Sequence, residues 1–113
     1  MNNIVEVVKL FSDQTRLRIL NILYNSEHCV CDLEAVLEMT QPNISKHIKK
    51  MSDLGILSKR KESYWIYYSL NTEVFEKYNF IESLMKDIRK EKLFQNDLKK
   101  LKKYLESPKS CHI

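Results

Sequence analysis

The sequence is poor in the residues that interrupt regular structure, because its 113 residues include a single glycine and only two prolines. This scarcity argues against long irregular loops and favours helices joined by short connections. It also leaves no glycine-rich phosphate loop, and the sequence has neither a Cys-x-x-Cys motif nor paired catalytic carboxylates. We therefore predict that the chain is not an enzyme and that it uses no organic cofactor.

Long apolar runs are missing as well. No segment approaches the roughly 20 apolar residues that span a bilayer, and the first eight residues carry no basic region followed by a long apolar run. We therefore expect a cytoplasmic protein without a membrane partner. In that reducing compartment the three cysteines, Cys29, Cys31 and Cys111, are more naturally metal ligands or redox-active thiols than parts of a disulfide framework.

The chain has the size and composition of one globular domain with a modest core, at 43% hydrophobic and 30% charged residues. We predict a single domain over residues 1–107 and a flexible tail over residues 108–113. The net charge is only +4, but lysine and arginine are concentrated in residues 46–50, 59–61 and 99–103. Such local positive fields indicate polyanionic partners, although each run taken alone is typical of a solvated helix face.

The spacing of apolar residues predicts four helices in the first half of the chain. They cover about residues 3–11, 14–25, a short stretch following Cys29-Val30-Cys31-Asp32, and 41–54. Thr40 is a good N-cap for the fourth helix, and Pro42 falls in its first turn, where a missing N–H costs little. Gly55 follows as the residue preferred past a helix C-terminus.

A β-hairpin is predicted next, because residues 56–61 and 64–70 are rich in β-branched and aromatic residues. The turn is expected at Glu62-Ser63, although it lacks the Asn-Gly or glycine of the tightest hairpins. From Asn71 almost to Pro108 the apolar residues continue at helical spacing. Because the apolar stripes of this last segment and of the first helix need a surface to bury against, we predict a homodimer.

Two short helices joined by a tight turn and followed by a two-stranded ribbon are typical of a winged helix-turn-helix domain, which places its second helix in the major groove. The predicted fold class is therefore mainly α with a small β-hairpin. With Ile44, Ile48 and Met51 turned inward, the outward face of the 41–54 helix carries amides, hydroxyls and cations. This chemistry is suited to double-stranded DNA.

We expect the amides of Gln41 and Asn43 to read base edges, and Ser45, Lys46 and Lys50 to reach phosphates. The cations of the hairpin would meet a flanking phosphate backbone or the minor groove. His47 falls on the same predicted face, with a structural hydrogen bond as its alternative role. The predicted DNA-contacting residues are Gln41, Asn43, Ser45, Lys46, His47, Lys50, Lys59, Arg60 and Lys61.

Four segments in this order resemble the arsenic-responsive branch of the ArsR/SmtB repressors. They are SDQTRLRIL at 12–20, CVCDL at 29–33, TQPNISKHI at 40–48 and LGIL at 54–57, within a likeness that covers about residues 4–70. The resemblance implies four helices, a hairpin and a last helix, with a homodimer formed through the first and last helices. It also implies binding to an inverted-repeat operator and release of that DNA when a ligand binds.

Soft thiolates at Cys29 and Cys31 suit trivalent arsenic or antimony, with Cd, Pb or Zn as alternatives. Residues two apart on a regular helix point to nearly opposite sides. Both sulfurs can therefore hold one ion only if Cys29 precedes the helix or the first turn is distorted. Because that helix is the first of the DNA-reading pair, ligation there could tilt or unwind it enough to spoil the fit to the groove.

In the arsenic-sensing pattern a third cysteine follows three residues after the second, but here that position is Glu34. Its carboxylate is a hard ligand and a poor replacement for a thiolate. We expect Cys111 to complete the site, from the same chain or across the dimer, with a free terminal thiol as the alternative. Cys29, Cys31, Cys111 and His112 could also form a tetrahedral zinc set. Two further readings stay open, namely a redox switch that pairs Cys111 with one of the other two cysteines, and a purely structural interaction module.

Overall fold

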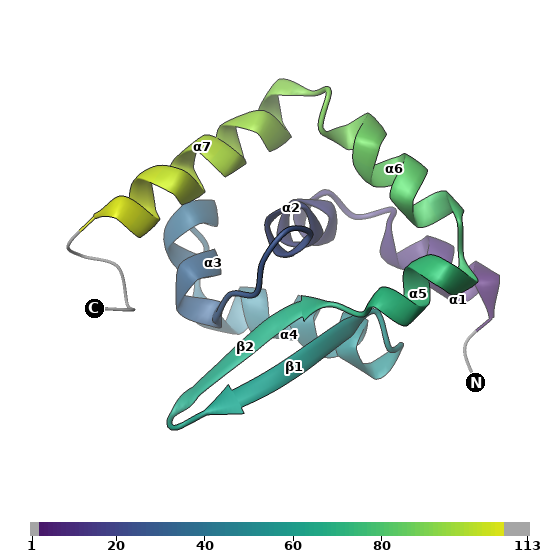
Figure 1. The fold of residues 1–113 in the computed structure, drawn as a ribbon, viewed down its shortest axis with the longest axis horizontal. Helices are drawn as coiled ribbons and strands as arrows, with labels where there is room; N and C mark the ends of the chain where they lie inside the picture. Colours follow the sequence, from purple (N-terminus) through teal and green to yellow (C-terminus); the bar gives the residue numbers. More distant parts are fainter. Residues whose placement is uncertain (1–2, 108–113) are drawn as a thin grey trace.

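The computed structural model describes residues 3–107, and the predicted flexible tail at 108–113 lies outside them. The described residues form helices and one antiparallel hairpin in the order of a winged helix-turn-helix domain (Figure 1). The helices are α1 (Ile4–Leu10), α2 (Gln14–Leu23), α3 (Val30–Leu37), α4 (Gln41–Asp53), α5 (Thr72–Lys77), α6 (Phe80–Ile88) and α7 (Lys92–Glu106). The strands are β1 (Leu57–Glu62) and β2 (Trp65–Leu70). Within residues 3–107, no helix combines the length and apolar character needed to cross a membrane.

The first, second and fourth helices begin and end within two residues of their predicted bounds, whereas α3 begins at Val30, inside the segment that was expected to precede it. The Asp13 side chain caps α2 by accepting a hydrogen bond of 3.0 Å from the Arg16 amide. Thr40 occupies the N-cap position of α4 without a side-chain cap hydrogen bond, and Pro42 lies in the first turn. Gly55 takes a φ of 77° just past the end of α4, which is the conformation that favours glycine at this position.

The hairpin, or wing, pairs β1 with β2 from Leu57 opposite Leu70 to Glu62 opposite Trp65. The turn therefore consists of Ser63 and Tyr64, one residue later than predicted, and Tyr64 belongs to no strand. Ser63 adopts a φ of 55°, a conformation that glycine usually supplies in a two-residue turn. Because the sequence has no glycine here, the turn could not be placed from composition.

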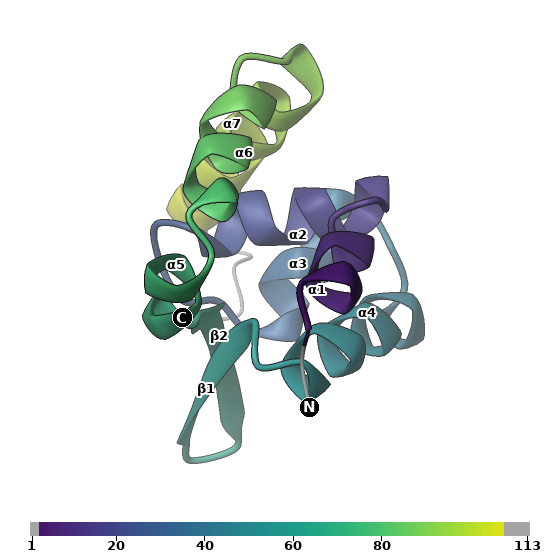
Figure 2. The same ribbon diagram turned by 90° about the vertical axis from the view of Figure 1, so that its right-hand side faces the viewer.

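The C-terminal segment, expected as one helix, is divided into α5, α6 and α7. Tyr78 has an extended backbone between α5 and α6, and Glu91 is extended immediately before α7. The two breaks let α6 and α7 form an arch over α2 (Figures 1 and 2). Helical spacing persists across these breaks, so periodicity alone did not reveal them.

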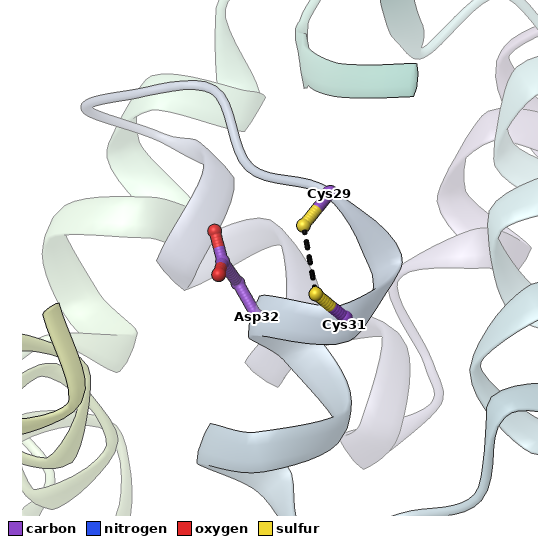
Figure 3. Close-up of side chains that lie close together, drawn as sticks. All are labelled: Cys29, Cys31 and Asp32. Atoms are coloured by element: carbon purple, nitrogen blue, oxygen red, sulfur yellow. Dashed lines mark hydrogen bonds between the residues drawn. The ribbon is translucent and has the colours of Figure 1, made fainter. Parts of the chain in front are cut away.

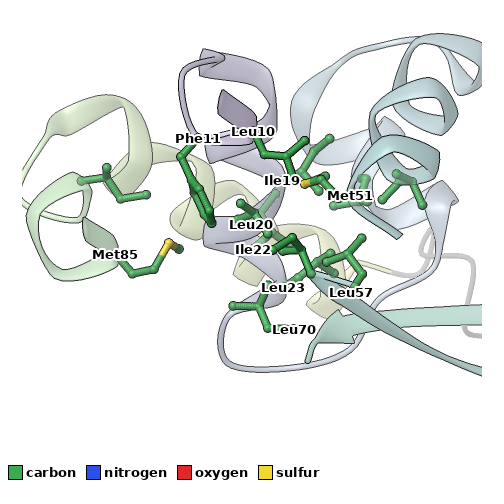
Figure 4. Close-up of a cluster of buried hydrophobic side chains, with 14 of the residues drawn as sticks. Leu10, Phe11, Ile19, Leu20, Ile22, Leu23, Met51, Leu57, Leu70 and Met85 are labelled. Carbon is green, nitrogen blue, oxygen red and sulfur yellow. The ribbon is translucent and has the colours of Figure 1, made fainter. Parts of the chain in front are cut away.

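Helix α2 is the centre of the core. Its residues Ile19, Leu20, Ile22 and Leu23 are at most 1% exposed. Side chains from α1, α4, α6 and both strands surround it (Figure 4). Because each such side chain contributes roughly 1.5–3 kcal/mol when fully buried, α2 is the element on which the others are assembled.

Polar contacts fix α7 on α2. The Arg18 guanidinium donates to both carboxylate oxygens of Asp97, at 2.8 and 2.9 Å, and Asp97 is 1% exposed. The buried Asn21 amide donates to the Phe94 carbonyl at 3.0 Å. The bidentate Arg18–Asp97 pair and the Asn21–Phe94 hydrogen bond together give α7 a defined register on α2.

We predict that Asp97→Ala lowers the free energy of unfolding by about 3 kcal/mol, because it leaves the largely buried Arg18 guanidinium without its partner. The matched control is Asp87→Ala, which removes a carboxylate from an exposed pair with Lys90 at 3.2 Å. The control should change the free energy by no more than about 0.5 kcal/mol. Urea denaturation followed by circular dichroism measures both, and equal midpoints for the two variants would contradict the assignment.

Candidate nucleic-acid interface and thiol cluster

The inner and outer faces of α4 divide as the sequence predicts. Ile44, Ile48 and Met51 are buried in the core. Gln41, Lys46, Lys49 and Lys50 are exposed, and Asn43 and Ser45 are half-buried on the same helix. The Gln41 amide donates to the Ser45 hydroxyl at 2.8 Å, so the first turn presents an ordered polar edge.

His47 lies at the edge of this face and is far less exposed than its lysine neighbours. Its side chain is buried, and Nδ1 lies 3.4 Å from Nη1 of Arg16 on α2. Burial lowers the pKa of His47, which favours the neutral ring that can accept a hydrogen bond at Nδ1. Arg16 is held in turn by the Leu10 carbonyl at 2.8 Å. His47 therefore has the alternative, structural role of fastening α4 to α2.

Positive charge gathers around an open hollow on the α4 face. Lys46, His47, Lys49 and Lys50 line it from α4, with Arg16 from α2. Asp53 also lines the hollow and forms an exposed pair with Lys49 at 3.1 Å. The sequence analysis assigned Lys46 and Lys50 to phosphate contacts, and both side chains lie at this hollow.

The three cations of the wing differ in whether they are ion-paired within the chain. Lys59 and Lys61 are exposed on β1. Arg60 lies between two carboxylates, with Nη2 2.6 Å from Glu27 and Nη1 3.1 Å from Glu62, and its guanidinium stacks over the Tyr67 ring at 4.7 Å. Its charge is compensated within the chain, so it is a weaker candidate for a phosphate contact than its two neighbours.

Two cysteines meet at the start of α3. Cys29 is the N-cap residue, with φ −84° and ψ 168°, and Cys31 is the second residue of the helix. Their Sγ atoms lie 3.3 Å apart (Figure 3). This is the first of the two geometries that the sequence analysis required, because the extended backbone of Cys29 turns its sulfur back toward Cys31.

A carboxylate that sequence reasoning missed completes this cluster. Asp32 is fully buried, and one of its oxygens lies with both sulfurs in a group no wider than 4.8 Å (Figure 3). The Asp32 carboxylate also contacts Nδ1 of the buried His28 at 2.9 Å. An acidic residue in the first turn, three positions after the N-cap, was the available signal. Cys111 and His112 lie outside the described residues.

The sulfur pair fits a thiophilic ion. Two thiolates that each lie about 2.3 Å from one tetrahedral ion are about 3.8 Å apart, close to the observed separation. Cys29 is 3% exposed, and burial raises the pKa of its thiol. Cys31 is half-buried and disulfide-bonded, so ligation of one ion by both sulfurs requires its prior reduction. We call Cys29, Cys31 and Asp32 the thiol cluster.

Comparison with known proteins places the central part of the chain in a family. Residues 13–59 match the arsR family of bacterial regulatory proteins. An arsenic resistance transcriptional regulator, ArsR1, from Pseudomonas putida is 37% identical over 83 residues, which are 73% of this chain and 62% of that protein. This chain thus spans about three fifths of the length of that relative.

Two further likenesses extend this comparison. An arsenical resistance operon repressor from Staphylococcus xylosus is 36% identical over 65% of this chain and 70% of that protein. The winged helix-turn-helix DNA-binding domain of a possible ArsR-family regulator from Mycobacterium bovis superposes with a TM-score of 0.63 at 20% identity, covering 74% of this chain and 79% of that chain. The latter confirms the predicted fold, and the named relatives are regulators of transcription, not enzymes.

We predict that Cys29 of the folded chain reacts with iodoacetamide at pH 8 at least about tenfold more slowly than Cys29 of the urea-unfolded chain. Burial both shields the sulfur and, by raising its pKa, lowers the thiolate fraction at a given pH. Peptide mass spectrometry of timed samples measures the rate. The same peptide in urea is the control, and equal rates in the two conditions would contradict the buried placement.

Proposed function

Because this chain belongs to the arsR family of bacterial regulatory proteins, we propose that it is a transcriptional repressor released from its operator by trivalent arsenic or antimony bound at Cys29 and Cys31. The observation that carries this proposal is the 3.3 Å approach of two sulfurs at the head of the helix-turn-helix unit. Cd, Pb and Zn are the alternative ligands of the same thiols. The compartment proposed for this activity is the cytoplasm.

The proposed DNA contacts follow the exposed polar face of α4. Gln41 and Asn43 would read base edges in the major groove, while Ser45, Lys46 and Lys50 would bind phosphates. Lys59 and Lys61 would reach the flanking backbone or minor groove from the wing. His47 is left out of this set because it is buried, and Arg60 because Glu27 and Glu62 compensate its charge.

A homodimer on an inverted-repeat operator is part of the proposal. Three apolar residues of α1, namely Ile4, Val5 and Val8, are about half exposed, at 54, 58 and 48%. Leu105, near the end of α7, is 44% exposed. A second copy of the chain would cover these side chains, and two copies would present α4 to half-sites about one helical turn of DNA apart.

Release follows from the position of the thiols. Ligation would fix two sulfurs that belong to the N-cap and first turn of α3, so it acts on the end of that helix. Helix α3 packs directly on α4, and a shift of α3 would therefore displace the helix that enters the groove. We keep Cys111 as the proposed third ligand, since Asp32 is a hard ligand and already holds His28.

We expect the double variant Lys46→Ala, Lys50→Ala to weaken binding to operator and random DNA alike. It should flatten the slope of log affinity against log salt by about one unit per lost phosphate contact. Fluorescence anisotropy between low and moderate salt measures this. Lys86→Ala, Lys90→Ala is the control, because it removes the same charge from exposed positions on and just after α6, which lies on the far side of α2 from α4 and the wing (Figure 2). Equal slopes for the two double variants would remove Lys46 and Lys50 from the interface.

We expect Cys29→Ser and Cys31→Ser to bind the operator with affinity within about threefold of the parent and to resist release by arsenite. The thiols are proposed as sensors and not as DNA contacts, so only the response should be lost. The measurement is a release titration with trivalent arsenic, antimony, Cd, Zn and peroxide in parallel, followed by intact mass. Added ion mass supports ligation, whereas a loss of two hydrogens indicates a disulfide. Arsenite release that persists in both variants would contradict the assigned thiols.

A further inference from the structure

The segment that leads into the thiol cluster also lies along the wing. His28 and Tyr68 form an isolated antiparallel bridge, in which the His28 amide donates to the Tyr68 carbonyl at 3.0 Å and the Tyr68 amide donates to the His28 carbonyl at 2.9 Å. Tyr68 faces Lys59 across the hairpin. His28 therefore adds a one-residue third strand to the outer edge of β2, directly before Cys29.

A second contact connects the same segment to β1. Both carboxylate oxygens of Glu27 accept hydrogen bonds from the Arg60 guanidinium, at distances of 2.6 to 3.1 Å. Arg60 stacks in turn over Tyr67 of β2. Two consecutive residues before Cys29 thus contact both strands of the wing, one through the backbone and one through an ion pair.

Side chains continue this connection into the thiol cluster. The His28 ring is 4% exposed, with Nδ1 2.9 Å from the Asp32 carboxylate and Nε2 2.8 Å from the Ser26 hydroxyl. Asp32 is itself a member of the cluster, and its amide donates to the Cys29 carbonyl at 3.2 Å. A series of hydrogen bonds therefore runs from the backbone of Cys29 through Asp32 and His28 to the Tyr68 backbone.

We propose that His28 and Asp32 are positioning residues that couple occupation of Cys29 and Cys31 to the placement of the wing, so that ligand binding displaces the wing together with α4. This inference rests on the proposed function. Spreading the two sulfurs from 3.3 Å to the roughly 3.8 Å that one tetrahedral ion requires would move the backbone of Cys29, which shares a peptide bond with His28. The bridge to Tyr68 depends on backbone direction and opens when that peptide rotates.

The first turn of α3 lies where the ligand would act. The second half of the helix is anchored by Leu33, Val36 and Leu37, all buried in the core. The first turn holds the buried Asp32, whose carboxylate contacts His28 at 2.9 Å. A movement of the first turn is therefore passed through Asp32 to His28 and the wing, while the apolar side chains hold the rest of the helix in the core.

Amide hydrogen exchange of the full chain, read by NMR with and without arsenite under a phosphine reductant, tests the coupling. The Tyr68 amide belongs to the bridge, while that of Tyr67 points to β1 by the alternation of an antiparallel ladder, which makes it the internal control. We expect arsenite to accelerate exchange at Tyr68 by at least about tenfold and to leave Tyr67 nearly unchanged. Unchanged protection of Tyr68 in the arsenite-loaded chain would overturn the inference.

His28→Gln gives a second readout, with Ser26→Ala as the milder variant that removes only the Nε2 partner. We expect His28→Gln to bind arsenite with the parent's affinity but to lose DNA affinity on loading by several-fold less than the parent does. A full loss of DNA affinity on loading in His28→Gln would also overturn the coupling. The exchange experiment needs no substitution, so it decides the question even if a variant does not fold.

The two proposals fail differently. If arsenite binds the parent chain and leaves its DNA affinity unchanged, the proposed function is wrong, whatever happens at Tyr68. If arsenite releases DNA from the parent while the Tyr68 amide stays protected, the proposed function is supported and the coupling through His28 is wrong.

Discussion

The extended backbone of Cys29 is the constraint on which the thiol cluster depends. With helical dihedral angles at this residue, the sulfurs of Cys29 and Cys31 would point to nearly opposite sides of α3. The observed φ of −84° and ψ of 168° bring them to 3.3 Å and at the same time direct the preceding residue along β2. One non-helical residue therefore creates the sulfur pair and its contact with the wing.

A movement at Cys29 can displace neighbouring elements only if another part of the fold stays in place. Helix α2 supplies it, because its apolar side chains are almost completely buried and the Arg18–Asp97 pair fastens α7 to it. His47 joins α4 to the same body through Arg16. Helix α4 is thus supported from α2 on one side and from α3 on the other, and of these two supports it is α3 that carries Cys31 and follows Cys29.

Local patterns were sufficient for most of the fold. The apolar spacing of Ile44, Ile48 and Met51 predicted both the extent of α4 and its buried face, and Gly55 marked its end. The thiol geometry was also predictable in outline, because a spacing of two residues excludes a shared ion on a regular helix. These features depend on neighbours in the sequence.

The features that were missed depend on partners far along the chain. His47 sits at the edge of the polar face of α4, and its ring contacts Arg16, which is 31 positions away. Asp32 reads as an ordinary acidic residue of a first helical turn until His28 and the two sulfurs are placed around it. The breaks around α6 preserve helical spacing, so only the arch over α2 explains them.

The turn of the wing has a mechanical consequence. Ser63 takes a positive φ without being glycine, which stores on the order of 1 kcal/mol of backbone strain at the tip. At the other end of the ribbon, Leu57 and Leu70 are embedded in the hydrophobic core. Farther out, Glu27 holds Arg60 of β1 and His28 holds Tyr68 of β2, so bending of the ribbon is concentrated toward its tip. In the proposed complex with DNA, the tip would follow variations in groove width from one operator to another while the core keeps its packing.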